Sequence, residues 1–551
     1  MAEVIGIVGL AIAVFDQFLK LGDKTIETIQ CVRTFAEDLK DASETIRREQ
    51  GIAKALNYLL FEKSPKYGGQ MLFEQYDEEA QRFILSVVGE LVDALESAAK
   101  LLDTSPPSPL PAADLQRSGL SSHAGTLSSS ITLTEDKTNR AGLTFFERTS
   151  SSASLRRKLR WSFYDKKRAK DIIDRYAKLN GHLYRVVQLN SFASGIGVDL
   201  QHLENMKQSR AAQELGFDET ASLQLLAREA ALGMAANFEV SDGWMSTIED
   251  GRQVEGRFVT FVNEGRPYLQ DTCEYKLPSI SDGIDNQTRS RLNGLAALLQ
   301  QPKEQIFRIP KCIGWKYLPS TKDIAFIFES PGNPHASQPQ SLLHLLSMPE
   351  FKPTLQAKFQ LAYSLAKSIS QLQMVQWLHE SLRSENILFF PPPQGGSPDT
   401  VALSEPWVFG FDFSRPENFF SYGFADSEPE RDIYRHPERQ GNPTAMFSKW
   451  HDIYSLGVML LEIGIWEPAI QQEHPRDQFK NMKTPEDRKN RLVKVARKRL
   501  PPKMGGKYSD LVVRCLTGNF DVGDDTKGDI KLQQAFRSQV IEALGRVLES
   551  I

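Results

Sequence analysis

The sequence predicts an all-α helical bundle followed by a separate α+β domain. Three observations carry this prediction. Apolar residues in residues 1–216 recur at helical spacing. A segment rich in Ser, Thr and Pro, residues 104–154, interrupts that helical part. From residue 237 onward, short apolar runs that suit strands alternate with helical stretches. A length of 551 residues agrees with more than one domain, because a single core rarely extends over so long a chain.

The composition is that of a globular protein. Hydrophobic residues make up 40% and charged residues 25% of the chain, which favours a soluble globular protein over a disordered or membrane-spanning one. The formal net charge of -4 gives no overall attraction to nucleic acid, so we expect no nucleic-acid partner. Any basic surface that binds a partner must therefore be local.

Cysteine spacing and the first residues indicate the compartment. The four cysteines (Cys31, Cys273, Cys312 and Cys515) form no metal-binding or disulfide pattern, which favours a reducing, cytoplasmic location. The apolar start, Val4 to Phe15, is too short to span a bilayer, and no basic residue precedes it. We therefore expect neither a signal peptide nor a membrane span.

Each helix of the first domain is predicted from an apolar stripe. The first stripe comprises Val8, Ile12, Phe15 and Leu19; the second comprises Val32, Phe35, Leu39, Ala42 and Ile46; the third comprises Ile84, Val88, Leu91, Leu95, Ala98 and Leu102. Such stripes must be buried against one another, which predicts an antiparallel bundle. The Ser/Thr/Pro segment 104–154 buries too little apolar area to offset its ordering entropy, so we expect it to be disordered.

A further helix begins in a basic cluster. The stretch "LRRKLRWSFYDKKRAKDIIDRYAKLN" has an apolar side, and its start contains Arg156, Arg157, Lys158 and Arg160. A cluster of this size beside an amphipathic helix is attracted to anionic lipid. A bundle helix with a solvated basic face explains the same residues, because most charge runs are solvent faces. Both interpretations stay open here.

The first domain resembles a known family. The opening "MAEVIGIVGLAIAVFDQFLKLG" and the late "KLRWSFYDKKRAKDIIDRYAKLN" are similar to the fungal prion-inhibition and propagation (HeLo) domain, over residues 1–216. The resemblance implies a helical bundle that inserts its apolar N-terminus into membranes and causes cell death. The residues that would contact the membrane are Val4, Ile5, Ile7, Val8 and Ile12, together with Arg156, Arg157, Lys158 and Arg160. Alternatively, Val8, Ile12, Phe15 and Leu19 are ordinary core.

The second domain begins with a strand, helix, strand pattern. The runs "RFVTFV" and "IAFIFES" suit strands, and "SRLNGLAALLQQ" between them suits a helix. Ala362, Leu365, Ile369 and Leu372 then mark a helix that leads into "HESLRSENILFF". This stretch resembles the catalytic loop H-R-D-L-x-x-x-N of protein kinases.

Three further motifs extend the kinase resemblance in the correct order. "FGFDFSRP" places Asp412 at the D-F-G position, "YRHPERQ" places Glu438 at the A-P-E position, and "KWHDIYSLGVMLLEIG" contains Asp452 at the polar position of the large-lobe helix. The resemblance covers residues 237–548 and implies a bilobal fold in which Glu438 and Asp452 are structural.

Departures from the kinase pattern indicate lost catalysis. The loop keeps His379, Arg383 and Asn386, but Ser381 replaces the carboxylate that accepts the substrate proton. The chain between Phe238 and Tyr275 contains no lysine, so the strand lysine that binds the nucleotide phosphates in kinases is missing. Arg257 or Arg266 could replace it only in part. The resemblance still implies ATP and magnesium as cofactors, with Asn386 and Asp412 as ligands, because oxygen ligands suit magnesium. Loss of nucleotide binding is the simpler interpretation.

These features together predict a regulated effector. A degenerate kinase-like (pseudokinase) domain would control the helical bundle in fungal programmed cell death, with recruitment to an anionic plasma membrane and self-association of several chains. Two alternatives stay open: an ATP-binding kinase of atypical design, and a non-catalytic scaffold without membrane activity. The sequence names no upstream activating protein.

Overall fold

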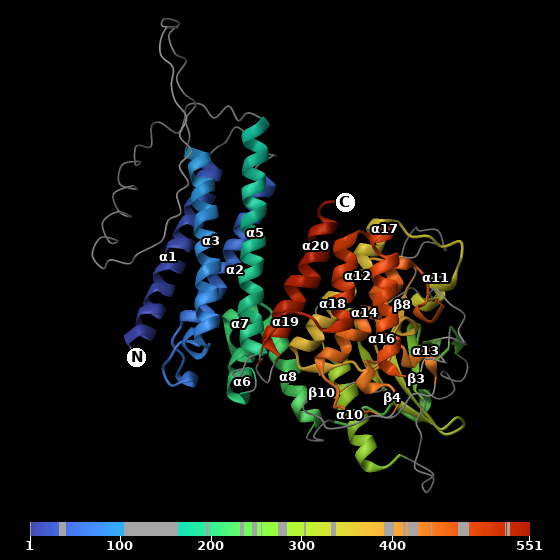
Figure 1. Cartoon of the computed structure of the whole chain (residues 1–551). Coiled ribbons are helices and arrows are strands. Elements are labelled where there is room, and N and C mark those ends of the chain that lie inside the picture. Colours follow the sequence, from blue (N-terminus) through green and yellow to red (C-terminus); the bar gives the residue numbers. More distant parts are fainter. Residues whose placement is uncertain are drawn as a thin grey trace, which may run out of the picture. The chain divides into compact units, whose positions relative to one another are not determined.

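The computed structural model describes most of both predicted parts (Figure 1). Described are residues 2–31, 40–103, 163–193, 197, 199–231, 236–244, 251–254, 256–273, 284–301, 303, 305–331, 338–390, 402–411, 415–416, 428–441, 443–471, 484–523, 525 and 529–551. These residues form an N-terminal helical region and a C-terminal region of antiparallel sheets and helices, which confirms the predicted fold class at that level. The Ser/Thr/Pro segment and the basic cluster at 156–160 lie outside the described residues.

The chain divides into two compact units, Met1–Lys54 with Gln81–Tyr184, and Ala55–Ala80 with Arg185–Ile551. Four helices build the first unit and continue in part into the second: α1 (Ala2–Cys31), α2 (Lys40–Phe61), α3 (Glu78–Asp103) and α5 (Phe163–Phe192). The predicted boundary at residue 216 differs from this division, because residues 185–236 pack within the second unit.

The buried side of α1 differs from the predicted stripe. Val8, Ala11, Phe15 and Phe18 are buried, whereas Ile12 is 38% exposed. At about 100° per residue, Phe18 and Ala11 move the centre of the buried face away from Ile12. The stripe prediction for Ile12 is therefore wrong, and Leu19 is only half-buried. The large Phe18 ring lies 6.1 Å from the Tyr176 ring of α5.

Buried polar groups hold α2 to its neighbours in the first unit. The Gln50 side chain donates from Nε2 to the Leu19 carbonyl at 2.7 Å and accepts from the Tyr176 hydroxyl at 3.1 Å. The Asn180 amide donates to the Glu49 carbonyl and carboxylate, each at 2.9 Å. Because each of these buried groups finds a partner, the bundle core avoids the cost of unpaired polar atoms.

A five-stranded antiparallel sheet opens the C-terminal region. Its strands are β1 (Arg252–Gln253), β2 (Phe258–Asn263), β3 (Arg266–Cys273), β4 (Cys312–Leu318) and β5 (Asp323–Glu329), in the order β1-β2-β3-β5-β4. Helix α10 (Asn286–Gln300) connects β3 to β4 and packs on β4 and on α8 (Phe217–Ala231). In the register of the sheet, Asp271 of β3 lies opposite Phe258 of β2 and Phe326 of β5.

Helices make up most of the described residues after the sheet. The long ones are α12 (Leu355–Met374), α14 (Lys449–Ile465), α16 (Pro485–Arg499) and α18 (Gly506–Thr517). α14 is buried along nearly its whole length and contacts α12 and α18, so it is the centre of the core. Its residues belong to one continuous apolar cluster with one face of the sheet and α10.

Short elements complete the described part. The short strands are β6 (Gln340–Ser341), β7 (Trp377–Leu378), β8 (Ile387–Phe389), β9 (Trp407–Val408) and β10 (Arg415–Pro416); they form the sheets β6-β8-β9 and β7-β10. The short helices are α6 (Leu200–Gln208), α7 (Arg210–Glu214), α11 (Leu342–Ser347), α13 (Pro429–Asp432), α17 (Pro501–Met504), α19 (Ile530–Phe536) and α20 (Glu542–Leu548). Single turns of helix lie at Pro65–Tyr67, Leu72–Gln75, Asp242–Trp244, Gln305–Phe307, Ser384–Asn386, Pro437–Arg439 and Ala469–Gln471, and a π-helical turn lies at Arg537–Ile541. Within the described ranges, every helix is too short or too polar to cross a bilayer.

Candidate functional site

The loop after α12 is held by one carboxylate of α14. Asp452, in the first turn of α14, accepts from the backbone N–H of His379 at 2.8 Å and from that of Glu380 at 3.0 Å. Glu380 has a φ of +62°, a left-handed conformation that costs energy for a residue with a side chain. The two hydrogen bonds to a buried charge stabilise that conformation. Asp452 thus fixes the backbone path of the predicted catalytic loop.

His379 is fully buried, and both of its ring nitrogens are engaged. Nε2 lies 3.0 Å from the Phe409 carbonyl, so this nitrogen carries the proton and donates. Nδ1 then accepts from the Ser381 N–H at 3.3 Å. The imidazole also packs against the Phe411 ring, with centroids 4.5 Å apart. These contacts leave His379 no role as an acid or base and make it a packing residue.

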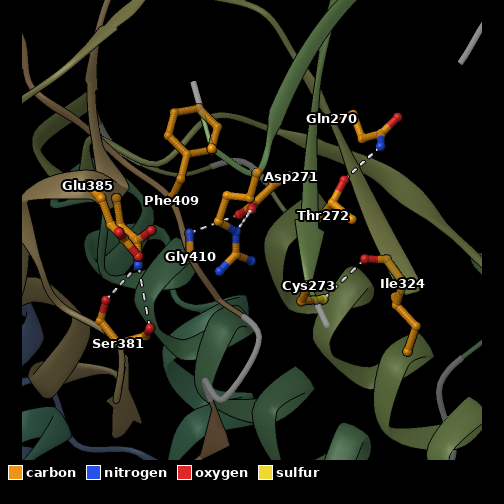
Figure 2. Close-up of polar contacts among 12 residues, drawn as sticks. Gln270, Asp271, Thr272, Cys273, Ile324, Ser381, Glu385, Phe409 and Gly410 are labelled. Carbon is orange, nitrogen blue, oxygen red and sulfur yellow. Dashed lines mark hydrogen bonds and ion pairs between the residues drawn. The ribbon is translucent and has the colours of Figure 1, made fainter. Parts of the chain in front are cut away.

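Ser381 and Asn386 face each other inside the same loop. The Asn386 amide donates to the Ser381 carbonyl at 2.8 Å and lies 3.4 Å from its hydroxyl (Figure 2). Both residues are buried. The Asn386 Oδ1 atom has no hydrogen-bond partner in the part of the chain that the structure describes. A serine hydroxyl is neutral at physiological pH and is a much weaker proton acceptor than a carboxylate.

Arg383 is neutralised by a neighbour. Its Nε lies 2.5 Å from the Glu385 carboxylate, and Arg431 of α13 lies 3.2 Å from the same oxygen. The Arg383 side chain is only 7% exposed, so this ion pair is largely shielded from water. A guanidinium held in this way is compensated within the loop and is poorly placed to bind a phosphate.

A buried aspartate of the sheet contacts the segment after β9. Asp271 of β3 accepts from the Gly410 N–H at 2.9 Å and from Arg257 Nε at 2.5 Å (Figure 2). The Asp271 and Arg257 side chains are 1% and 13% exposed. Because the guanidinium and the N–H together satisfy the carboxylate, a buried charge is tolerated here. Arg257, considered from the sequence as a partial replacement for the missing lysine, is thus paired with Asp271, whereas Arg266 is exposed.

Gly410 leaves no room for a side chain. Its φ is +83°, and a Cβ atom built on it would lie 2.1 Å from the Asn386 Nδ2 atom. The neighbouring Phe409 ring packs at 5.7 Å from Phe258 and 5.3 Å from Phe328. The position beside Asn386 therefore favours glycine over any residue with a Cβ atom. Asp412, the predicted second metal ligand, lies outside the described residues, so that assignment stays a prediction.

Glu438 lies between two histidines at a spacing that would suit a metal ion. His451 Nε2 is 3.3 Å and His436 Nδ1 is 3.6 Å from the Glu438 carboxylate. The opposite nitrogens, however, both accept hydrogen bonds: His436 Nε2 from Trp450 and His451 Nδ1 from the Ser448 N–H. His451 must then carry its proton on Nε2, the nitrogen that faces Glu438, where a metal needs a lone pair. The His436 Nδ1 atom lies 3.4 Å from the Glu438 backbone N–H, so this nitrogen is engaged as well. The donor set does not fit a metal.

Burial keeps both of these histidines uncharged. Desolvation lowers the pKa of His436 and of His451 to about 4. Two neutral rings therefore flank the Glu438 carboxylate, and His451 donates to it from Nε2. Glu438 itself is 53% exposed. The cluster connects the turn Pro437–Arg439 to the start of α14.

The predicted membrane residues are distributed over both sides of α1. Val8 is buried, Ile7 is half-buried, Ile12 is exposed, and the side chains of Val4 and Ile5 are outside the described part. The most exposed large apolar side chain of this helix is Leu10, at 56%. Leu10 was missed because it lies off the expected stripe, although the run of apolar residues around it was visible in the sequence.

The comparisons with known proteins assign no function to this site. A family model described as a domain of unknown function (DUF7580) matches residues 315–550, from β4 to the last helix. The match includes the loop around Ser381 and Asn386 but not β3 with Asp271. No curated protein matches the chain.

Proposed function

We propose that residues 237–548 form a bilobal, protein-kinase-like domain that transfers no phosphate and regulates the N-terminal helices. The four kinase-like motifs of the sequence support this proposal, and so does the sheet of five antiparallel strands with a helix between β3 and β4. Resemblance of fold alone does not define function, so the proposal depends on the residues of the site.

The single observation that carries the proposal is the position of Asp271. Active kinases have a lysine on strand β3 that binds the nucleotide phosphates. β3 of this chain carries a buried aspartate, and its carboxylate is occupied by Arg257 and by the Gly410 N–H. A carboxylate repels phosphate, and the Arg257 guanidinium is already neutralised by it. This arrangement opposes ATP binding.

The loop supports the same conclusion. Phosphoryl transfer needs a carboxylate to accept the substrate proton and two ligands for magnesium. Ser381 offers only a hydroxyl. Two parts of the machinery, the strand lysine and the proton-accepting carboxylate, are thus absent at once, and restoring one of them by Ser381→Asp should not restore activity.

Nucleotide binding tests this part of the proposal. We expect Mg-ATP to leave the melting temperature of the full-length protein unchanged, since a ligand stabilises only the state that binds it. Incubation with radiolabelled ATP should give no incorporation into the chain or into generic substrates. A saturable rise in melting temperature that Asn386→Ala removes, or labelling that Asp412→Ala abolishes, would instead favour an atypical kinase.

The helical part is proposed as a HeLo-like, membrane-active effector. Its support in the structure is the outward side of α1, where Leu10 is 56% and Ile12 38% exposed although both are apolar. Gly6 and Gly9 lie beside them and are open to solvent. Glycines lower helix stability, which favours release of the segment. In this proposal the kinase-like part restrains the helices until an upstream partner acts.

Liposome leakage distinguishes an effector from a scaffold. We expect residues 1–236 to release dye from anionic liposomes more strongly than the full chain does, and Leu10→Glu to abolish the release. Gln17→Glu is the matched control, because it adds the same charge at an exposed polar position of the same helix. Leakage that Leu10→Glu leaves intact, with the helical signal retained, would favour the scaffold.

A further inference from the structure

One stretch of the C-terminal region is strongly basic. Residues 485–507 contain nine Lys and Arg against two acids, a net charge of +7, whereas the whole chain has a net charge of -4. This stretch forms α16, α17 and the start of α18. A local field of this strength attracts anionic partners even when the protein as a whole is acidic.

The packing of α16 turns several of these charges outward. Leu492, Val493, Val495 and Ala496 are buried in the core. The opposite side exposes Lys494, Arg497 and Lys498, and the following turns expose Lys503 and Lys507. We call these five residues the basic face. Because 3.6 residues make one helical turn, Lys494, Arg497 and Lys498 lie side by side on one surface of the helix.

Ion pairs fix both ends of α16. Arg488 binds Asp432 at 2.8 Å and Gln440 at 3.0 Å near the first turn. Arg499 binds Glu467 at 2.8 Å at the last turn. Arg488 and Arg499 thus pair with groups of the same domain, and these contacts hold α16 in place. The helix that carries Lys494, Arg497 and Lys498 is thus held in place before a partner binds, whereas Lys503 donates to the Ile465 carbonyl at 2.9 Å.

The chemistry of the basic face selects the class of partner. The exposed large apolar side chains of the described residues all lie outside 484–523. Protein interfaces have apolar or aromatic cores with little lysine, which this surface lacks. Four to eight Lys and Arg on a helix surface are the recognised signature of contact with anionic lipid headgroups. Five exposed cations without an apolar centre fit a charged lipid surface best.

We propose that the basic face docks the C-terminal region onto anionic phospholipid headgroups through electrostatic contact alone. No side chain inserts into the hydrocarbon, so the contact is reversible and weakens as salt screens it. This inference is independent of the proposed function, because it requires neither loss of phosphotransfer nor insertion of α1.

The test compares two charge reversals in the full-length chain. The first variant carries Lys494→Glu, Arg497→Glu and Lys498→Glu. The matched control carries Arg252→Glu, Arg266→Glu and Lys322→Glu, three exposed residues on the strands and a turn of the sheet, so the change in net charge is identical. Binding is measured by co-sedimentation with phosphatidylcholine vesicles, with and without phosphatidylserine, at low and high salt. Melting temperatures verify that all three proteins are folded.

We expect the wild-type protein to bind only the vesicles with phosphatidylserine, and the α16 variant to bind them about 100-fold more weakly, since each basic residue near an anionic surface strengthens binding about fivefold. The control should bind within a few-fold of wild type. Equal losses in both variants, or no loss in the α16 variant, would overturn the proposal. Tighter binding of a DNA duplex than of the vesicles, lost in the α16 variant, would overturn the lipid assignment.

Discussion

The carboxylate of Asp271 lies 2.9 Å from the backbone nitrogen of Gly410 and joins the five-stranded sheet to the segment after β9. The two residues are 139 positions apart in the chain. Arg257 Nε completes the contact at 2.5 Å. The Asp271 carboxylate is thus satisfied by an internal ion pair and a backbone hydrogen bond, so the stability of the fold depends on it.

Asp271→Asn should destabilise the protein by about 2 to 3 kcal/mol, because it leaves the largely buried Arg257 guanidinium without a counter-charge. The free energy of unfolding from urea titration measures this loss. Arg257→Gln should lower the free energy of unfolding by a similar amount.

The double variant Asp271→Asn with Arg257→Gln should lose clearly less free energy of unfolding than the sum of the two single losses, since neither charge is then left unpaired. Additive losses in this double-mutant cycle would show that the two side chains do not interact in solution.

Gly410→Ala should lower the free energy of unfolding by more than the strain of a left-handed backbone conformation alone explains. The new Cβ would lie 2.1 Å from Asn386 Nδ2, in addition to the strain at a φ of +83°. We expect a loss of about 3 kcal/mol or more. Gly265→Ala is the matched control, because its φ is +76° and nothing lies within 4 Å of its Cβ position; strain alone predicts about 1 to 2 kcal/mol there. Equal losses at the two positions would contradict the packing against Asn386.

His202 should make the protein less stable in mild acid. Desolvation lowers its pKa to about 4, because the ring is buried between the Tyr67 hydroxyl at 2.8 Å and the Ser191 carbonyl at 2.9 Å. The unfolded chain takes up a proton near pH 6.5 and the folded protein does not, so stability falls as pH drops from about 6.5 toward 4. Between pH 7.5 and 5 we expect this residue to contribute a loss of about 2 kcal/mol. In His202→Gln that part of the pH dependence should disappear; an unchanged slope in urea titrations would refute it.

Glu462 should have the opposite pH dependence. Complete burial raises its pKa to about 7, even though Ser384, Tyr434 and the Ala469 N–H all contact the carboxyl group. A raised folded pKa gives stability that is fully present below about pH 4.5 and is lost as pH rises through 7. Glu462→Gln has no such charge to bury. We therefore expect the variant to gain about 3 kcal/mol relative to wild type between pH 4.5 and 8, and a constant difference across that range would rule this out.

The order of elements could be predicted from the sequence because it depends on local periodicity. The run "RFVTFV" corresponds to β2, "IAFIFES" to β5 and "SRLNGLAALLQQ" to α10, each within a few residues. The stripe from Ala362 to Leu372 lies in α12. Alternation and helical spacing are properties of neighbouring residues, and packing rarely overrides them in long, regular segments.

The site could be predicted only in part because it is formed by long-range contacts. The missing lysine was visible in the sequence, but no local pattern pairs Asp271 with a glycine 139 residues away. The contact of Gly410 with Asn386 also joins residues far apart in the chain, so no local pattern indicated it. Likewise, α1 presents Leu10 to solvent because the bulk of Phe18 decides which side is buried. Side-chain volume and chain path, which periodicity does not encode, determined these outcomes.

Asp452 should be one of the least replaceable residues of the loop. Its two oxygens accept from the N–H groups of His379 and Glu380, and Asp452→Asn turns one of these acceptors into an N–H donor facing another N–H. We expect a loss of about 3 kcal/mol in the free energy of unfolding, since a buried, charge-assisted pair of hydrogen bonds becomes a repulsive contact. Glu380→Gly should be neutral or stabilising by up to about 1 kcal/mol, because glycine adopts a φ of +62° without strain. If Asp452→Asn is as stable as wild type, or Glu380→Gly is strongly destabilised, then the strained backbone of Glu380 is not what Asp452 stabilises.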